Sequence, residues 1–311
     1  MEAENGSKGN ADAAFYRSPG FLCWVSLRST QPTNVTFRIT AMKDTECVRF
    51  LQWALPQLNL RWAGFRKVRK QACKRIQRRL VELGLSDIDA YQSYLNTHPE
   101  EWTILDHYCR ITISRFYRDK QIFQHLHQEL LPQLIQLAQE RGDTELVCWS
   151  AGCASGEEAY TLSIIWYLAK LSQISHLSLR IIATDANAYL LERARTGYYQ
   201  WGSLTEIPSD WLAQAFTKSD KFYCIRPEFR EAIEFKQQDI RTTMPSESFH
   251  LILCRNLVLT YFDADLQQKV LSRIVKRLVP GGVFVVGSHE ALPSNFRQMQ
   301  AVQLGVYRKE G

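Results

Sequence analysis

The sequence predicts an α/β protein in which a helical N-terminal domain precedes a doubly wound, mainly parallel sheet. Two observations carry this prediction. Apolar residues recur at helical spacing from Met42 to about Asp119, with no strand-like run among them. After Glu145, short apolar runs alternate with amphipathic helical segments. Such alternation is typical of parallel strands joined by helical crossovers, whose helices cover both faces of the sheet.

The chain has 311 residues, of which 45% are hydrophobic and 23% charged, as is usual for a folded globular protein. At roughly 150 residues per domain, this length predicts about two domains. No apolar run approaches the ~20 residues that a membrane helix needs, and the polar N-terminus does not resemble a signal peptide. We therefore expect a cytoplasmic protein that does not span a membrane.

The N-terminal part is expected to contain an extension followed by helices. Residues 1–41 are rich in Gly, Ser, Asn and Thr and show no period, which predicts a loosely ordered extension. Residues 42–119 are predicted to form the helical domain, with Ser86 as the N-cap of a helix that starts after Leu85. A longer helix is predicted over residues 120–139, where Pro132 is expected to break it.

The remainder, residues 120–311, contains the predicted sheet. Its strands are expected over residues 146–150, 179–184, 249–253 and 283–287, which are apolar on both faces. Crossover helices are expected over residues 157–171, 188–195 and 263–279. The segment from about 198 to 234 breaks this alternation with its Tyr, Trp, Pro and Phe residues, and we expect a small inserted lobe there. Pro280-Gly281-Gly282 predicts a turn between the last crossover helix and its strand.

The cysteines and histidines do not predict a metal or redox site. Eight cysteines occupy positions 23, 47, 73, 109, 148, 153, 224 and 254, and no pair has the two-residue spacing of zinc and thioredoxin sites. Cys148 and Cys254 lie in apolar runs, where cysteine behaves as a small hydrophobe. We expect reduced thiols. The closest two of the seven histidines, His125 and His127, would face different sides of a helix.

The positive charge is concentrated in one segment. The net charge is +6, yet nine basic residues and no acidic one lie between Arg61 and Arg79, and the rest of the chain has 29 basic and 32 acidic residues. The nine are Arg61, Arg66, Lys67, Arg69, Lys70, Lys74, Arg75, Arg78 and Arg79. Apolar residues at helical spacing run through the segment, which predicts an amphipathic helix with a cationic outer face. Such a face is either solvated or an electrostatic dock for nucleic acid, anionic lipid or an acidic protein.

Polar residues follow four consecutive strands at the point where each strand ends. The first strand runs into the small residues of "CWSAGCASGEEAYTL", although their spacing matches neither G-x-G-x-x-G nor a P-loop. Asp185 ends the second, where its carboxylate can either accept both hydroxyls of a ribose or cap the next helix. Asp239-Ile240 and Arg255-Asn256 end the next two. Because these ends meet at one edge of a parallel sheet, they predict a site for a nucleoside-bearing cofactor.

Five motifs carry a family resemblance. They are "ITISRFYRD", "WSAGCASGEEAYTL", "ATDANAYLLERARTGYY", "LILCRNLVLTYFD" and "LVPGGVFVVGSHEAL". In this order they resemble the CheR-type methyltransferases, which use S-adenosyl-L-methionine to methylate glutamate side chains of chemotaxis receptors. The resemblance implies a class I (Rossmann-like) methyltransferase domain over residues 120–311, with a small antiparallel β lobe inserted at about 198–234. It also implies S-adenosyl-L-homocysteine as the product.

By position along the chain, the resemblance assigns ten residues to the site. Those expected beside the cofactor are Thr112, Ser114, Arg118, Glu158, Asp185, Asp239, Ile240, Arg255 and Asn256. Among them, Glu158 is expected to hold the methionine part and Asp185 the ribose, whereas Asp239-Ile240 would flank the adenine and Arg255-Asn256 would line the floor. The expected catalytic residues are Arg118 and Tyr261, which would guide the acceptor carboxylate and face the transferred methyl.

The chemistry and the substrate follow from the same resemblance. A glutamate carboxylate has an ordinary pKa near ~4.3, so at neutral pH it needs no general base. The segment 216–235 is shorter than in relatives that hold a receptor-tail pentapeptide, so pentapeptide tethering is not expected. We expect an acidic or helical protein substrate to dock on the basic helix from Arg61 to Arg79.

Two other classes of function stay open at this point. One is a methyltransferase for RNA, DNA or a small molecule, with the basic helix holding phosphates. The sheet half lacks the Asn/Asp-Pro-Pro-Tyr/Phe motif of base methylation, so a nucleic-acid partner is not expected. The other is a cofactor-binding adaptor without catalysis, which the presence of Arg118, Glu158, Asp185 and Tyr261 disfavours.

Overall fold

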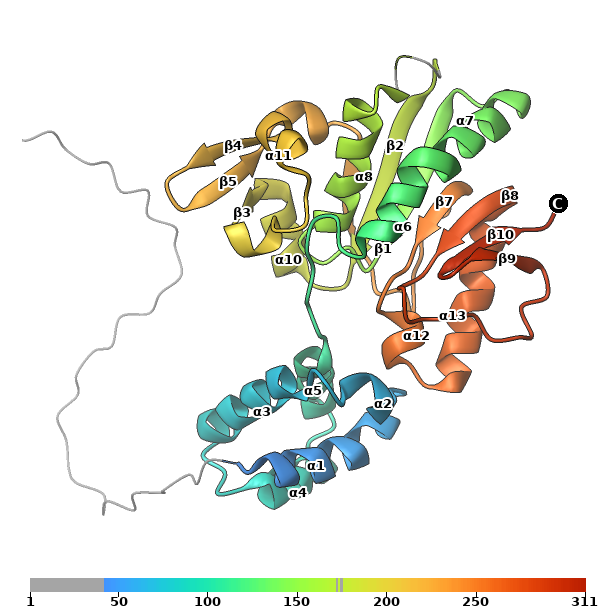
Figure 1. The fold of residues 1–311 in the computed structure, drawn as a ribbon. Coiled ribbons are helices and arrows are strands. Elements are labelled where there is room, and N and C mark those ends of the chain that lie inside the picture. Colours follow the sequence, from blue (N-terminus) through green and yellow to red (C-terminus); the bar gives the residue numbers. More distant parts are fainter. Residues whose placement is uncertain (1–41, 172, 174–175) are drawn as a thin grey trace, which may run out of the picture. The chain divides into compact units, whose positions relative to one another are not determined.

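The computed structural model describes residues 42–171, 173 and 176–311 (Figure 1). The predicted extension, residues 1–41, lies outside the described residues. Within the described ranges, no helix combines the length and apolar character that crossing a membrane demands.

Five helices fill most of residues 42–109, as predicted for the helical N-terminal region. They are α1 (Asp44–Gln57), α2 (Trp62–Phe65), α3 (Arg69–Leu83), α4 (Ile88–Thr97) and α5 (Glu101–Cys109). Phe50, Ile76 and Tyr91 are buried between them, in a core that continues onto one face of the sheet. The boundary that we predict after residue 119 stays a prediction, because this core is shared.

The start of α4 differs from the prediction in its capping residue. Asp87, not Ser86, is the N-cap, and its carboxylate accepts a hydrogen bond from the backbone N–H of Ala90 at 2.8 Å. The Ser86 hydroxyl donates to the other Asp87 oxygen at 2.8 Å. A carboxylate also interacts favourably with the positive end of the helix dipole, which a hydroxyl does less well.

The basic segment is divided between two helices, so the prediction of a single helix over it is wrong. α2 ends at Phe65 and α3 begins at Arg69. Within α2, Gly64 allows a close approach to another part of the chain, because a Cβ there would lie 2.2 Å from the backbone oxygen of Thr260. Helical spacing holds only inside α3, whose inner side buries Ala72 and Ile76.

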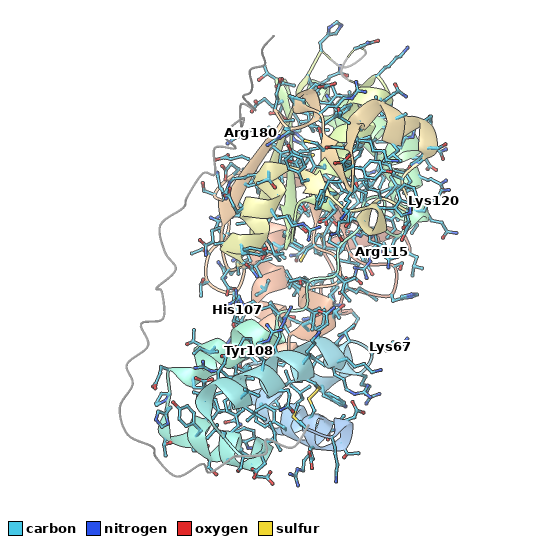
Figure 2. The ribbon with its side chains drawn as sticks, turned by 90° about the vertical axis from the view of Figure 1, so that its left-hand side faces the viewer. Lys67, His107, Tyr108, Arg115, Lys120 and Arg180 are labelled. Atoms are coloured by element: carbon cyan, nitrogen blue, oxygen red, sulfur yellow. A yellow bond between two sulfur atoms is a disulfide. The ribbon has the colours of Figure 1, made fainter. Side chains whose placement is uncertain are left out.

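The expectation of reduced thiols is wrong for two of the eight cysteines. Cys47 of α1 and Cys73 of α3 form a disulfide, visible as the yellow bond in Figure 2. Their Cα atoms are 5.9 Å apart although they are 26 residues apart in sequence. The pairing arises from the packing of α1 on α3, so no local spacing could reveal it. Cys109, Cys148 and Cys254 are free and buried, as expected for small apolar residues.

The helix predicted over residues 120–139 forms as three joined segments. These are α6 (Lys120–His125), a π-helical turn (Leu126–Leu130) and α7 (Leu131–Glu140). Pro132 lies in the first turn of α7. Proline has no backbone N–H and its ring crowds the carbonyl four residues earlier, so the preceding turn widens. The predicted break at this proline is confirmed.

The sheet has seven strands in the order β6-β2-β1-β7-β8-β10-β9. Their bounds are β1 (Glu145–Ala151), β2 (Ser178–Asp185), β6 (Ile233–Gln237), β7 (Phe249–Leu253), β8 (Leu278–Val285), β9 (Met299–Gln303) and β10 (Val306–Lys309). The strands from β6 to β8 pair in parallel, and β10 is antiparallel to both of its neighbours. The strand order reverses direction at β1, which is the switch point where such folds bind ligands.

Two layers of helices cover this sheet (Figure 1). Together with α7, α8 (Glu157–Leu168) and α10 (Ala188–Thr196) bury Leu162 and Leu191 with Cys148 of β1 in one core. α13 (Ala264–Arg277) packs Ile274 against Trp149 and other residues of the opposite face. The predicted doubly wound α/β class is therefore confirmed.

Strand bounds differ from the prediction at the C-terminal end. β8 begins five residues before the predicted 283, and Pro280-Gly281-Gly282 lies within it instead of forming a turn before it. A Cβ on Gly282 would lie 3.2 Å from the His250 carbonyl oxygen, so glycine lets β8 pass close to β7. β9 and β10 were not predicted, because the alternation of strand and helix ends with β8.

A second, small sheet lies in the segment predicted as an inserted lobe. It has three antiparallel strands in the order β3-β5-β4, with bounds β3 (Tyr198–Tyr199), β4 (Phe216–Ser219) and β5 (Phe222–Ile225). A short helix, α11 (Ser209–Ala215), precedes β4. The implied antiparallel lobe is confirmed.

Candidate cofactor and methyl-transfer site

Two adjoining cavities form one cleft at the carboxyl ends of β1, β2, β6 and β7. Both are lined by Thr112, Gly152, Asp185, Leu257 and Tyr261. The first cavity is also lined by Asp239 and Ile240. The second also takes in Ser114, Arg118, Glu158, Arg255 and Asn256. The structure thus brings all ten residues assigned from the motifs to one cleft, and their individual roles remain predictions.

Asp185 lies between the two cavities at the end of β2. Its Oδ2 accepts a hydrogen bond from the Ala154 N–H at 2.9 Å, and its Oδ1 accepts one from the Asn187 N–H at 2.8 Å. The Asn187 side chain caps α10, so Asp185 is not the helix cap. Each carboxylate oxygen can accept a further hydrogen bond. Burial raises the pKa of Asp185, against the effect of the two backbone N–H groups.

Arg255 holds together the carboxylates at the floor of the second cavity. Its guanidinium donates to Asp119 at 2.6 Å, to Glu158 at 3.1 Å and to the Arg118 carbonyl at 2.7 Å. The side chain is 4% exposed and lies over the ring of Phe123. Burial would raise the pKa of Asp119, but the attraction of Arg255 outweighs it and holds that pKa below its usual value. Asp119 therefore stays ionised, and both carboxylates are paired with Arg255.

Arg118 differs from Arg255 in its surroundings. Its guanidinium donates to the Ile113 carbonyl at 2.7 Å. In the part of the chain that the structure describes, it takes part in no salt bridge, since Asp119 and Glu158 pair with Arg255. Arg255, and not Arg118, therefore forms the ion pairs with these two carboxylates. A partly exposed guanidinium in the cleft is left for an anionic ligand.

Tyr261 closes the same cleft from the end of α12 (Val258–Tyr261). Its ring contacts Phe65 of α2 edge-on, with centroids 5.2 Å apart. Burial raises the pKa of Tyr261 to about 12. The hydroxyl therefore remains protonated at neutral pH and can donate a hydrogen bond.

Glu290 is a supporting residue that sequence reasoning missed. One carboxylate oxygen accepts hydrogen bonds from the backbone N–H groups of Asn256 at 2.8 Å and Gly287 at 2.7 Å, and the other accepts from the Thr260 hydroxyl at 2.5 Å. The side chain is buried. It fixes the turn that leads into α12 and so positions Tyr261. The only signal in the sequence was an acid within an otherwise apolar C-terminal motif.

The backbone of the cleft is unusual at several points. Asp119, Ala154 and Asn256 have positive φ angles of 61°, 48° and 53°. Residues other than glycine adopt this conformation at a cost and do so most often at functional sites. Each of the three adjoins a residue of the cleft, so the surrounding contacts hold the cleft in a shape that the local sequence does not favour.

S-adenosyl-L-methionine fits the chemistry of these residues. Asp185 offers carboxylate acceptors for ribose hydroxyls, and Glu158 offers a carboxylate for the methionine ammonium. Ile111, Ile240 and Leu257 supply apolar surface in the first cavity for a purine ring. Fold and cleft together define a class I S-adenosylmethionine-binding domain.

Comparison with known proteins gives the family. The profile described as "CheR methyltransferase, SAM binding domain" matches residues 112–307. The chain therefore belongs to the CheR methyltransferase family, as the motifs indicated, and its cofactor is S-adenosyl-L-methionine.

Several relatives are named as chemotaxis methyltransferases. The chain is 34% identical over 182 residues to the chemotaxis protein methyltransferase of Listeria innocua, covering 58% of this chain and 66% of that one. It is 28% identical over 294 residues to the chemotaxis protein methyltransferase of Salmonella typhimurium, covering 91% and 96%. An uncharacterised 104.1 kDa protein of Rhodobacter capsulatus is 32% identical over 219 residues, 70% of this chain but 23% of that protein. The matched regions thus cover less than two thirds of the Listeria innocua and Rhodobacter capsulatus proteins but nearly all of the Salmonella typhimurium protein.

Proposed function

We propose that the protein transfers the methyl group of S-adenosyl-L-methionine to glutamate side chains of an acidic, helical protein. One observation carries this proposal. Arg118 lies in the second cavity outside any salt bridge among the described residues, while Arg255 neutralises the carboxylates beside it. Such a cleft favours an anionic acceptor. The names of the chemotaxis relatives support the same acceptor class.

The residues of the cleft fit a reaction that needs positioning more than acid–base chemistry. When bound, the cofactor supplies a sulfonium methyl, to which a carboxylate oxygen bonds as the carbon–sulfur bond breaks and its electron pair passes to sulfur. An ionised glutamate needs no proton removed. Arg118 would hold the acceptor carboxylate by charge-assisted hydrogen bonds, and the protonated Tyr261 hydroxyl would donate a second. Orientation of this kind accounts for much of the rate gain in such reactions.

The proposed docking surface is part of the basic segment. Four of its nine basic residues make structural contacts: Arg61 with the carbonyls of Leu259 and Thr260, Arg69 with Asp44, Arg75 with the carbonyls of Tyr108 and Arg110, and Arg79 with Glu101. The other five are exposed and form no salt bridge within the described ranges: Arg66, Lys67, Lys70, Lys74 and Arg78.

Three of these five residues form a stripe that leads to the cleft. Lys70, Lys74 and Arg78 follow at intervals of four residues, so they share one face of α3. Lys67, labelled in Figure 2, precedes them and lines the second cavity together with Arg118. An acidic helix lying along this basic stripe, Lys67 to Arg78, would present its carboxylates at the mouth of the cleft. This geometry favours a protein substrate over nucleic acid, because the stripe is short and leads to the cleft.

The proposal does not include tethering of a receptor-tail pentapeptide. β4 and β5 are joined directly by the two residues between Ser219 and Phe222, so the small sheet has no long loop there to hold a pentapeptide. We also propose a cytoplasmic location, which rests on the family alone, because the Cys47–Cys73 disulfide removes the argument from reduced thiols.

The test is transfer of labelled methyl groups from the cofactor to protein. The purified chain is incubated with labelled S-adenosyl-L-methionine and bacterial membranes that contain chemotaxis receptors, and the labelled band is then treated with mild alkali. We expect base-labile label that is released as methanol, because methyl esters hydrolyse in alkali. Label that survives alkali, or that resides in RNA, would overturn the proposal. The variant Arg118→Ala supplies the background.

A further inference from the structure

Four charged side chains join α5 to the loop after β6. Arg241 donates to both oxygens of Asp106, at 2.7 and 2.8 Å, and also to Asp239, at 2.7 Å. Arg110 donates to Asp106 at 2.9 Å and to Asp239 at 3.3 Å. Two carboxylates and two guanidiniums thus form a closed network with balanced charge. Its fork-shaped Arg241–Asp106 pair is the geometry in which arginine binds carboxylates most strongly.

The network lies at the first cavity. All four of its residues line that cavity, and the side chains of Asp106, Asp239 and Arg241 are 13%, 25% and 23% exposed. Burial would raise the pKa of Asp106 and of Asp239, but hydrogen bonds from Arg241 outweigh it and lower both pKa values. The same bonds raise the pKa of Arg241. Asp106, Asp239 and Arg241 therefore stay ionised at neutral pH.

Two walls of the first cavity meet through this network. One wall is α5 and the chain after it, including Cys109, Ile111 and Thr112. The other is the loop of residues 238–241, which contains Asp239 and Ile240. The walls lie 135 residues apart in sequence, and Arg241 spans them. The Asp239 carboxylate is engaged by the two arginines, and its expected place beside the adenine stays a prediction.

We propose that this four-residue network is a clamp that sets the affinity for the adenosine part of the cofactor. It holds the two walls of the first cavity at the separation that a purine nucleoside requires, and Asp106, Arg110, Asp239 and Arg241 act as positioning residues. The clamp lines the first cavity, whereas Arg118 lines only the second, so the clamp affects binding of the cofactor and not the methyl-transfer step. This inference rests on the proposed placement of the cofactor in the cleft.

Loss of the clamp should leave the loop itself folded. Arg273 of α13 donates to the carbonyls of Arg241 at 3.0 Å and Thr242 at 3.0 Å, and so holds the loop from the other side. Asp106→Asn therefore weakens the contact with α5, while Arg273 and the bonds from Arg241 to Asp239 still hold the loop in place. This separates an effect on the cavity from general unfolding.

The experiment is a double-mutant cycle on the full chain with Asp106→Asn, Arg241→Gln and the double variant. S-adenosyl-L-homocysteine binding is measured by calorimetry. KM for the cofactor and kcat are measured with the receptor-containing membranes as the methyl acceptor. We expect each single variant to weaken binding by about tenfold or more, because a charge-assisted buried pair is lost. The loss of affinity in the double variant should be smaller than the sum of the two single losses, since both changes break the Asp106–Arg241 pair, although each residue also has a second partner in the network. KM for the cofactor should rise by a factor similar to the loss of S-adenosyl-L-homocysteine affinity, and kcat at saturation should change by less than about twofold.

The matched control is Arg79→Gln. Arg79 makes an equally fork-shaped pair with Glu101, at 2.9 and 2.8 Å, but neither residue lines the cleft. This variant should lower thermal stability as much as Arg241→Gln and leave cofactor affinity unchanged. Weakening of binding that equals that of Arg241→Gln would overturn the clamp, because it would then reflect only lost stability.

The outcomes also separate this inference from the proposed function. Unchanged cofactor affinity in Asp106→Asn and Arg241→Gln, with a wild-type protein that binds and methylates, overturns the clamp alone. A wild-type protein that binds the cofactor but does not methylate glutamate overturns the function and leaves the clamp standing on its binding data. A wild-type protein that fails to bind S-adenosyl-L-homocysteine overturns both.

Discussion

Asp185 is the residue whose ionisation should govern cofactor affinity. Burial raises its pKa, whereas Arg241 holds the pKa values of Asp106 and Asp239 below their usual range. As the pH falls, Asp185 is thus the first of the three to take up a proton. Hydroxyl groups donate to a carboxylate better than to a carboxylic acid, so cofactor binding favours the ionised form. Affinity should fall as the pH drops through a value above aspartate's usual ~3.9 and be constant above it.

Calorimetry with S-adenosyl-L-homocysteine over a range of pH measures this dependence. In Asp185→Asn, the affinity should be lower by about tenfold or more at neutral pH, because at least one charged acceptor is lost. Its dependence on acid pH should disappear. A wild-type slope that persists unchanged in Asp185→Asn would assign the titration to another group.

Arg118 should act on turnover and not on the cofactor. The variant Arg118→Ala removes the guanidinium available to the acceptor and leaves the Arg255 network with Glu158 and Asp119 intact. We expect kcat to fall by about 100-fold or more, in line with the loss of a charge-assisted contact of roughly 3 kcal/mol in the transition state. The Kd for S-adenosyl-L-homocysteine should change by less than about threefold. Equal losses in kcat and in affinity for S-adenosyl-L-homocysteine would make Arg118 a cofactor ligand.

The sequence predicts site residues that lie at recognisable positions of motifs and strands. It does not predict residues whose role depends on tertiary contacts. Asp185 was predictable because its position at a strand end places it at the switch point of the sheet. Asp106 and Arg241 were not, since their pairing depends on α5 lying against a loop 135 residues away. For the same reason, the motif assigned Asp239 to the adenine, while the structure engages its carboxylate with two arginines.

The Cys47–Cys73 disulfide should stabilise the packing of α1 on α3. It closes a loop of 26 residues, and loop closure of this length contributes about 2–4 kcal/mol by restricting the unfolded chain. Cys73→Ser should lower the free energy of unfolding by that amount in urea denaturation. Reductant should lower the free energy of unfolding of the wild type to the same value and leave that of the variant unchanged. Cys224→Ser, which alters a free and partly exposed thiol, is the control. If reductant leaves the free energy of unfolding of the wild type unchanged, the disulfide does not stabilise this packing.

Secondary-structure elements were predictable where periodicity alone defines them. β7 has the bounds that its apolar run predicts, and Pro132 breaks its helix as expected. The division of the basic segment between α2 and α3 was not, because the helical spacing on either side of the break carried no sign of it.

At the scale of the whole molecule, charge is distributed so that one exposed stripe leads to the reaction cleft. The basic stripe lies on α3 and ends at Lys67, which lines the second cavity. Each exposed pair with an acidic substrate would contribute about 0.2–1 kcal/mol. Recognition by such pairs is weak, steers the encounter and is screened by salt. The substrate should therefore bind with a Michaelis constant that rises steeply with ionic strength.

Charge reversal of the stripe tests this directly. The variant Lys70→Glu, Lys74→Glu, Arg78→Glu should raise KM for the protein substrate by about tenfold to a hundredfold, as expected from three pairs turned repulsive. It should also remove the salt dependence and leave S-adenosyl-L-homocysteine affinity unchanged. Arg69 and Arg75 are kept, because both make structural contacts. The matched variant Lys221→Glu, Lys269→Glu, Lys276→Glu makes the same change in net charge at exposed positions elsewhere. If both variants raise KM equally, net charge alone steers the substrate, and the stripe is only a solvated face.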